Sequence, residues 1–185
     1  MSEDKNVSLQ DANQLETEEK LQTEDIEIID QGNNYRFYKI NGTFELGCDI
    51  YNSSKVIVFS ERTQRPMIVS KIDSDLIEIR IGYGTGISGC RYFNVKTNQM
   101  SEEFLYVIAN NGTKIAYLDG AINNRKIIVK DIYKTNGNFV PFELDFSHEH
   151  TPVIEAEFSD DSSMLYITYM KGESYVTIVK TLNLS

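Results

Sequence analysis

The sequence predicts an all-β fold: an antiparallel meander of about 10–12 strands over residues 25–185, forming a two-sheet sandwich or a barrel-like domain. The first observation behind this prediction is a strict alternation of apolar and charged residues, seen in Ile77–Ile81, Phe142–Phe146 and Ile154–Phe158. Successive side chains of a strand point to opposite faces. Each of these segments therefore has one apolar and one charged face, which is typical of an antiparallel sheet with one side in water.

The second observation is that turn signals fall between the apolar runs. They are Asn41-Gly42, Asn111-Gly112, Asp119-Gly120, Asn136-Gly137 and Lys171-Gly172. Asn-Gly is a strong signal for a hairpin, because both central residues of the favoured turn need positive φ. Parallel strands would need crossovers of a dozen or more residues, for which the chain has no room. The acidic pairs Asp73/Asp75 and Asp160/Asp161 are predicted to hydrogen-bond their own turns.

Charge is concentrated at the N-terminus. Residues 1–30 hold ten acidic side chains against two lysines, while the whole chain carries a net charge of −10. We therefore predict an acidic flexible tether over residues 1–24, with a short helix over residues 11–22 as the alternative, and one β domain over residues 25–185. The rest of the chain is near neutral, so we expect no nucleic-acid partner and no docking on anionic lipid. No apolar run reaches the roughly 20 residues that a transmembrane helix needs.

The two cysteines, Cys48 and Cys90, both follow a glycine in a predicted strand. Two thiols do not complete a zinc site. They could form one disulfide closing a loop of about 40 residues, which would stabilise the fold by roughly 3–4 kcal/mol. The alternative is two buried free thiols that pack as small apolar side chains.

The segment Gly84–Gly89 matches G-x-G-x-x-G and follows a predicted strand. A dinucleotide-binding loop must be followed by a helix, whose N-terminus holds the pyrophosphate. Here the next residues, Cys90–Val95, have the composition of a strand. We predict a glycine-rich hairpin or bulge and no bound cofactor, with close approach of a ligand to its backbone as the alternative.

His148 and His150 are the only histidines, and on an extended strand they would point the same way. Zinc requires three or four protein ligands, and the sequence has no further cluster to supply them. We therefore predict a solvated loop with no metal and no catalytic residue. The alternative is a hydrolase whose loop-built site would start from Asp145, His148, Glu149 and His150.

Tyrosines are frequent at two places, Tyr35–Tyr38 and the pair Tyr166 and Tyr169. Aromatic residues favour strands, so these are predicted to lie in the core or in cross-strand pairs. A platform for a sugar or a peptide is the alternative.

A weak internal repeat is also present. Residues Ile108–Tyr117 align without a gap with Phe158–Ile167 at an offset of fifty, and Ile128–Lys130 aligns with Ile178–Lys180. This pattern of strand, polar turn, strand and strand resembles a blade of TolB-like and WD-type β-propellers. The resemblance implies a partial or atypical β-propeller-like array as the alternative fold.

The stretch from Arg91–Thr97 through Ser101–Phe104 is similar to uncharacterised small lipoproteins and secreted β-domains of Gram-positive bacteria. These proteins have no known activity, so the resemblance implies none for this chain.

Taken together, these features favour a non-catalytic extracytoplasmic binding domain, tethered to the cell surface and partnered by a protein or a carbohydrate. Its expected state is a monomer or a weak dimer. A cytoplasmic location, the hydrolase and a structural module that dimerises through an edge strand remain the alternatives.

Overall fold

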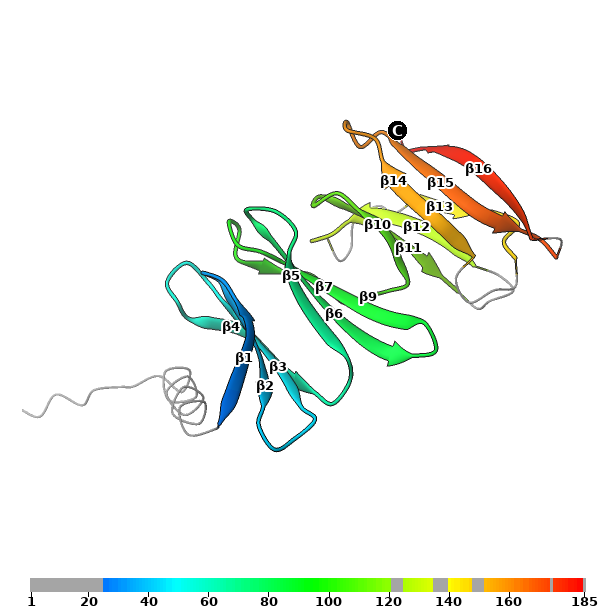
Figure 1. The fold of residues 1–185 in the computed structure, drawn as a ribbon. Helices are drawn as coiled ribbons and strands as arrows, with labels where there is room; N and C mark the ends of the chain where they lie inside the picture. Colours follow the sequence, from blue (N-terminus) through cyan, green and yellow to red (C-terminus); the bar gives the residue numbers. More distant parts are fainter. Residues whose placement is uncertain (1–24, 121–124, 135–139, 148–151, 174, 185) are drawn as a thin grey trace, which may run out of the picture. The chain divides into compact units, whose positions relative to one another are not determined.

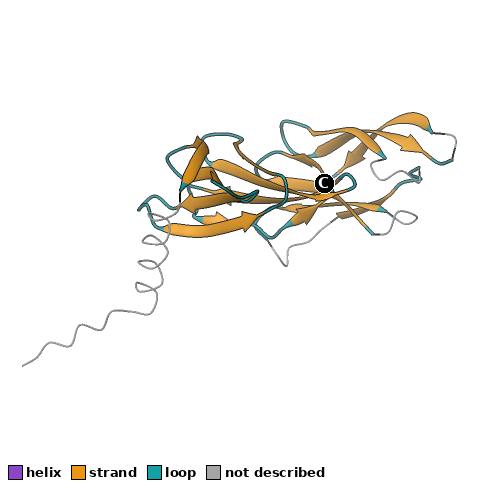
Figure 2. Ribbon diagram, turned by 60° about the horizontal axis from the view of Figure 1, so that its bottom comes forward, coloured by secondary structure: helices purple, strands orange, loops and turns teal. Residues whose placement is uncertain are grey.

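The computed structural model describes residues 25–120, 125–134, 140–147, 152–173 and 175–184. Within these ranges every regular element is a β-strand, and 16 strands form four antiparallel sheets (Figures 1 and 2). The all-β prediction is confirmed, and none of the four sheets closes into a barrel. No helix among the described residues is long and apolar enough to cross a bilayer. The predicted tether and the alternative helix over residues 11–22 lie outside the described residues.

The strand count exceeds the predicted 10–12 because several strands are too short to show an alternation. The clearest cases are β8 (Gln99–Met100) and β9 (Phe104–Leu105), which have two residues each and both pair with β7 (Ile87–Asn94).

The chain divides into two compact units after Gln64. The first unit contains sheet I, in which four strands pair in sequence order. These strands are β1 (Ile26–Gln31), β2 (Tyr35–Ile40), β3 (Leu46–Tyr51) and β4 (Ile57–Thr63).

Sheet I is packed around a tyrosine that lies over a glycine. Tyr38 on β2 is fully buried and is the ladder partner of Gly47 on β3. A Cβ atom at Gly47 would lie 2.3 Å from Cε2 and Cζ of the Tyr38 ring, so this position accepts only glycine without movement of the ring. The buried carboxylate of Asp49 accepts hydrogen bonds from Arg36 and Ser60, each at 2.8 Å. The buried charge is therefore paired, as it must be in a core.

The second unit contains three sheets. In sheet II the strand order is β5-β6-β7-β8, and β9 also pairs with β7. The strand order is β10-β11-β12-β13 in sheet III and β14-β15-β16 in sheet IV. The strands not yet bounded are β5 (Met67–Lys71), β6 (Leu76–Gly84), β10 (Val107–Asn110), β11 (Lys114–Asp119), β12 (Lys126–Asp131), β13 (Val140–Glu143), β14 (Val153–Phe158), β15 (Met164–Lys171) and β16 (Val176–Asn183).

Sheet III buries both of its faces. One face carries Leu118 and Ile127 into a cluster with Leu165 and Ile167 of sheet IV, as in a β-sandwich. The opposite face carries residues into a second cluster with sheet II. The members of that cluster are Leu76, Cys90, Tyr92, Phe104, Ile115 and Ile132. Sheets II, III and IV are thus held together by two apolar cores that share the central sheet.

The predicted turns are present wherever they fall in the described residues. Gly42 and Gly112 have φ of 74° and 81°, and each lies between two paired strands. Asp73 accepts backbone hydrogen bonds from Asp75 at 2.7 Å and from Leu76 at 2.8 Å. Asn136-Gly137 lies outside the described residues.

The expectation of a wet charged face is wrong for Ile77–Ile81. Glu78 is only 6% exposed, and its carboxylate accepts a hydrogen bond from Arg80 Nε at 3.0 Å. The two side chains lie on the face of sheet II that also carries Tyr92 and packs on sheet III. Alternation identified the strand correctly, but here Glu78 is buried and pairs with Arg80, whose side chain remains partly exposed.

We expect the substitution Gly47→Ala to lower the free energy of unfolding by about 1–3 kcal/mol, because the new methyl group overlaps the buried Tyr38 ring. Urea denaturation followed by circular dichroism measures the loss. Gly82→Ala is the matched control: Gly82 also lies in a strand, but its added Cβ would meet Pro66 at an ordinary 3.5 Å. Equal losses in the two variants would contradict the proposed overlap.

Candidate interaction surface

Sheet IV has three strands, whereas each of the other sheets has at least four. Its last strand, β16, pairs with β15 over eight residues, and no strand in the described part of the chain pairs with its other side (Figure 1, red). A row of unpaired backbone donors and acceptors along a strand is a template for another strand.

The hydrogen-bond pattern identifies which residues form this row. Leu184 N donates to Ser163 O at 2.8 Å, directly beyond the last ladder pair, Met164 with Asn183. Bonded and non-bonded pairs alternate in an antiparallel ladder, so the even-numbered residues of β16 bond to β15. The backbone groups of Thr177, Val179 and Thr181 therefore point away from β15. We call these three residues the β16 edge.

The side chains of β16 are sorted by the same alternation. Leu182 is buried in the core shared with sheet III, and Ile178 packs against that core. On the opposite face Val179 is 77% exposed, with Thr177 and Thr181 exposed on either side of it. The exposed face of β16 thus carries mainly β-branched side chains and no charge, while Lys180, the one charged residue of this strand, has the same parity as Ile178 and Leu182.

Tyr166 and Tyr169 lie on opposite faces of β15. Tyr169 is buried and meets the ring of Phe146 edge-on, with ring centroids 5.3 Å apart, so its predicted core position is confirmed. Tyr166 is 48% exposed and is the ladder partner of Thr181. It extends the exposed face of β16 onto the neighbouring strand.

A hollow of about 750 Å³ lies where β15 turns into β16. Its wall consists of Asp145, Phe146, Lys171, Gly172, Glu173, Val176 and Ile178. The exposed Asp145 carboxylate and the exposed Lys171 ammonium are 4.0 Å apart, a separation at which a surface ion pair contributes little to stability. The hollow therefore offers charged groups and apolar surface beside the first residues of the β16 edge.

Three of the four residues of the alternative hydrolase site, His148, Glu149 and His150, lie outside the described residues. The fourth, Asp145, lies in the wall of the hollow. Among the described residues no group of three or more His, Cys, Asp or Glu side chains is placed to hold a metal ion.

The glycine-rich segment is the hairpin between β6 and β7, as predicted. Gly84, Thr85 and Gly86 all have positive φ, and β7 begins directly after them at Ile87. The ladder also shifts register between Gly82 and Gly84. A helix N-terminus that could hold a pyrophosphate does not follow.

Cys48 and Cys90 lie in different units, on β3 and β7, and both are buried with free thiols. Burial raises the pKa of the Cys90 thiol to about 11. Burial, followed by the charges of Asp49 and Glu61, raises the pKa of Cys48 as well. Thiolates are the reactive form, so neither thiol is activated as a nucleophile in this structure.

Comparisons with known proteins assign no family to this geometry: no family model matches the chain, and no curated protein matches it significantly. The β16 edge was not found by sequence reasoning, because alternation marks a strand but does not tell which strand ends a sheet.

We expect both thiols to react slowly with Ellman's reagent in the native protein at pH 8 and to react rapidly, two per chain, once the protein is unfolded. Burial and the raised pKa values of Cys48 and Cys90 together slow the native reaction. The assay is run on protein purified without reductant, with and without guanidinium chloride. Unfolded protein that releases no thiol would instead carry the disulfide predicted from the sequence.

Proposed function

We propose that this chain is a non-catalytic extracytoplasmic interaction domain whose binding surface is the β16 edge. The strand that it accepts is β16 of a second copy of the chain. The observation behind the proposal is the eight-residue strand β16, on whose outer side Thr177, Val179 and Thr181 face no strand in the described part of the chain. The exposed, β-branched side chains of Thr177, Val179 and Thr181 suit addition of a further strand.

Self-pairing of β16 has a favourable register. A twofold axis through Val179 would place Thr177 opposite Thr181 of the second copy, and Ile178 opposite its Lys180. Thr–Thr pairs and apolar neighbours stabilise cross-strand contacts, while like charges directly opposite each other destabilise them. This register therefore keeps the two lysines apart and continues the sheet with matching faces.

Pairing along one strand buries little surface, and contacts below about 1,200 Å² are weak. We expect a dissociation constant on the order of 100 µM, consistent with the weak dimer expected from the sequence. An extracytoplasmic location is supported by the tether predicted over residues 1–24 and by the resemblance of the Arg91–Thr97 stretch to small lipoproteins and secreted β-domains. Titration of the thiols also bears on location, because disulfides persist in oxidising compartments.

The variant Val179→Pro tests the β16 edge. Proline removes an outward-pointing N–H and leaves the ladder with β15 intact, since residue 179 does not bond to β15. We expect self-association, measured by sedimentation equilibrium on the full chain, to weaken at least tenfold.

The matched control is Val179→Thr, which keeps the N–H and the branched shape and should associate like the original chain. Circular dichroism establishes that both variants retain their sheet content. The proposal is overturned if the original chain is monomeric up to about 1 mM, or if the proline variant associates as well as the threonine variant.

A further inference from the structure

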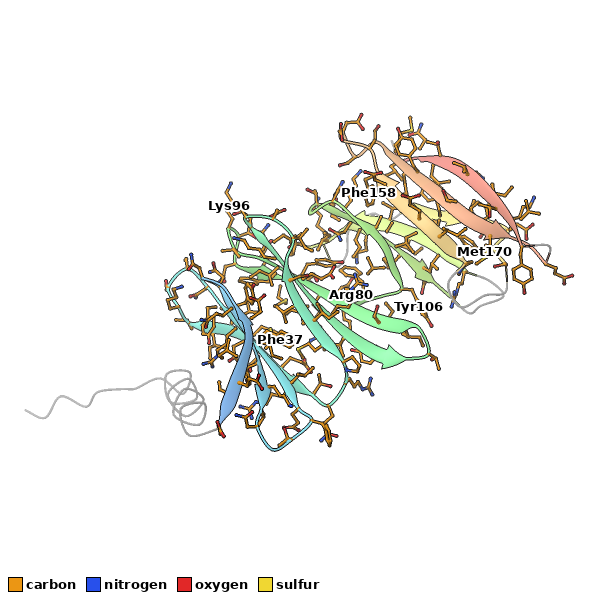
Figure 3. All side chains as sticks on the ribbon, in the orientation of Figure 1. Phe37, Arg80, Lys96, Tyr106, Phe158 and Met170 are labelled. Atoms are coloured by element: carbon orange, nitrogen blue, oxygen red, sulfur yellow. The ribbon has the colours of Figure 1, made fainter. Side chains whose placement is uncertain are left out.

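A second hollow, separate from the β16 edge, lies in the second unit between the β6–β7 hairpin, β10 and β14. Its volume is about 300 Å³, which is at the lower end of the range for small-molecule sites. Its wall combines apolar side chains, among them Tyr106, Ile108 and Val153, with two charged ones, Arg80 and Glu155. Figure 3 labels Arg80 and Tyr106 among the side chains of this unit. We call this hollow the Arg80 cleft.

The guanidinium of Arg80 is held in place by the carboxylate of Glu78 on the same strand. Its Nε donates to the carboxylate of Glu78 at 3.0 Å, and Glu78 is the one hydrogen-bond partner of this guanidinium among the described residues. The side chain of Arg80 nevertheless remains 39% exposed. A guanidinium has five N–H donors in a fixed fork, so donors remain for an oxygen-bearing ligand in the cleft.

Glu78 is itself fixed by the core. Burial, together with the nearby Glu78 carboxylate, raises the pKa of Tyr92, which is fully buried beside it. Asn110 Nδ2 in turn lies 3.5 Å from the Tyr92 hydroxyl. The guanidinium of Arg80 is therefore oriented before any ligand arrives, which lowers the cost of ordering it on binding.

Tyr106 is fixed in an unusual conformation at the wall of the cleft. Its φ is +52°, which is uncommon for a bulky residue. Its N–H donates to Ser88 O at 3.3 Å, and its carbonyl accepts from Leu118 N at 3.1 Å. The guanidinium of Arg125 lies 4.7 Å from the ring centroid. These contacts hold the tyrosine ring as a rigid part of the apolar wall.

The two charged side chains in the wall of the cleft indicate what charges a ligand should carry. The wall holds one charged side chain of each sign, the guanidinium of Arg80 and the exposed carboxylate of Glu155 on β14. A ligand with a single charge would be attracted by one of them and repelled by the other. A zwitterion would instead place its carboxylate on the guanidinium of Arg80 and its ammonium near Glu155. An apolar side chain on the carbon that joins these two groups would lie against Tyr106, Ile108 and Val153.

We propose that the Arg80 cleft binds a free α-amino acid with an apolar side chain. The site is independent of the β16 edge, so it can be tested whether or not the chain pairs with a second copy.

Isothermal titration of the full chain with L-leucine tests this proposal. We expect saturable binding of L-leucine. N-acetyl-leucine, which lacks the ammonium, and leucinamide, which lacks the carboxylate, should each bind at least tenfold more weakly.

Glu155→Gln should weaken L-leucine binding at least tenfold. Glu157→Gln, on the same exposed face of β14 but outside the cleft, is the matched control and should leave binding unchanged. Because Arg80→Gln would strand the buried Glu78, the guanidinium is tested with Arg80→Lys, which keeps the charge but loses the fork, and binding should fall in the same way.

The proposal is overturned if L-leucine shows no saturable binding up to about 10 mM. It is also overturned if either masked analogue binds as tightly as L-leucine, or if Glu157→Gln weakens binding as much as Glu155→Gln.

Discussion

The second unit depends on one constraint: sheet III must bury both of its faces at once. On β11 and β12, Ala116 and Val129 face sheet IV, while Ile115 faces sheet II. The charged side chain on this second face, Lys130, is only 9% exposed, and it reaches the carboxylate of Glu102 while its ammonium lies 5.5 Å from the centre of the Phe104 ring. A polar substitution at a buried apolar position of β11 or β12 would enter one core or the other, so the central sheet determines how all three sheets are packed.

The sequence does indicate that sheet III is buried on both faces, but by apolar runs and not by an alternating pattern. The segments Ile115–Leu118 and Ile127–Val129 are unbroken apolar runs, the pattern of strands buried on both faces. By contrast, Ile77–Ile81 and Ile154–Phe158 share one alternating pattern, yet Glu155 is exposed and Glu78 is buried. The difference comes from neighbours on other strands, Arg80 and Tyr92 among them, which a local pattern does not contain. Strands and turns could therefore be predicted, but the environment of each face could not.

The internal repeat also shows that a sequence pattern does not fix how strands pair. The two segments aligned without a gap both form three-stranded meanders, but the ladders place them differently. When Ile115 is matched with Leu165, their partners Asn110 and Phe158 are forty-eight residues apart, and the partners Lys130 and Leu182 are fifty-two apart. The first turn of the later segment is thus two residues longer, and the following connection is also two residues longer. A shift of two residues preserves the face of every side chain, which is why the pattern remained visible without a gap.

The other edge strands of this unit each have a feature that hinders pairing with a further strand. The outer side of β16 has none of these features. β13 contains Pro141, which has no N–H to offer, while β8 and β9 are two residues long. β5 has five residues, and the edge strands β10 and β14 contact each other. β16 has eight residues and no proline, and its one lysine, Lys180, directs its backbone groups toward β15. Natural sheets usually guard such an edge with charges, prolines or bulges, because an unguarded edge adds strands. The length of β16 and its lack of those devices support the proposal that a second copy of the chain pairs with it.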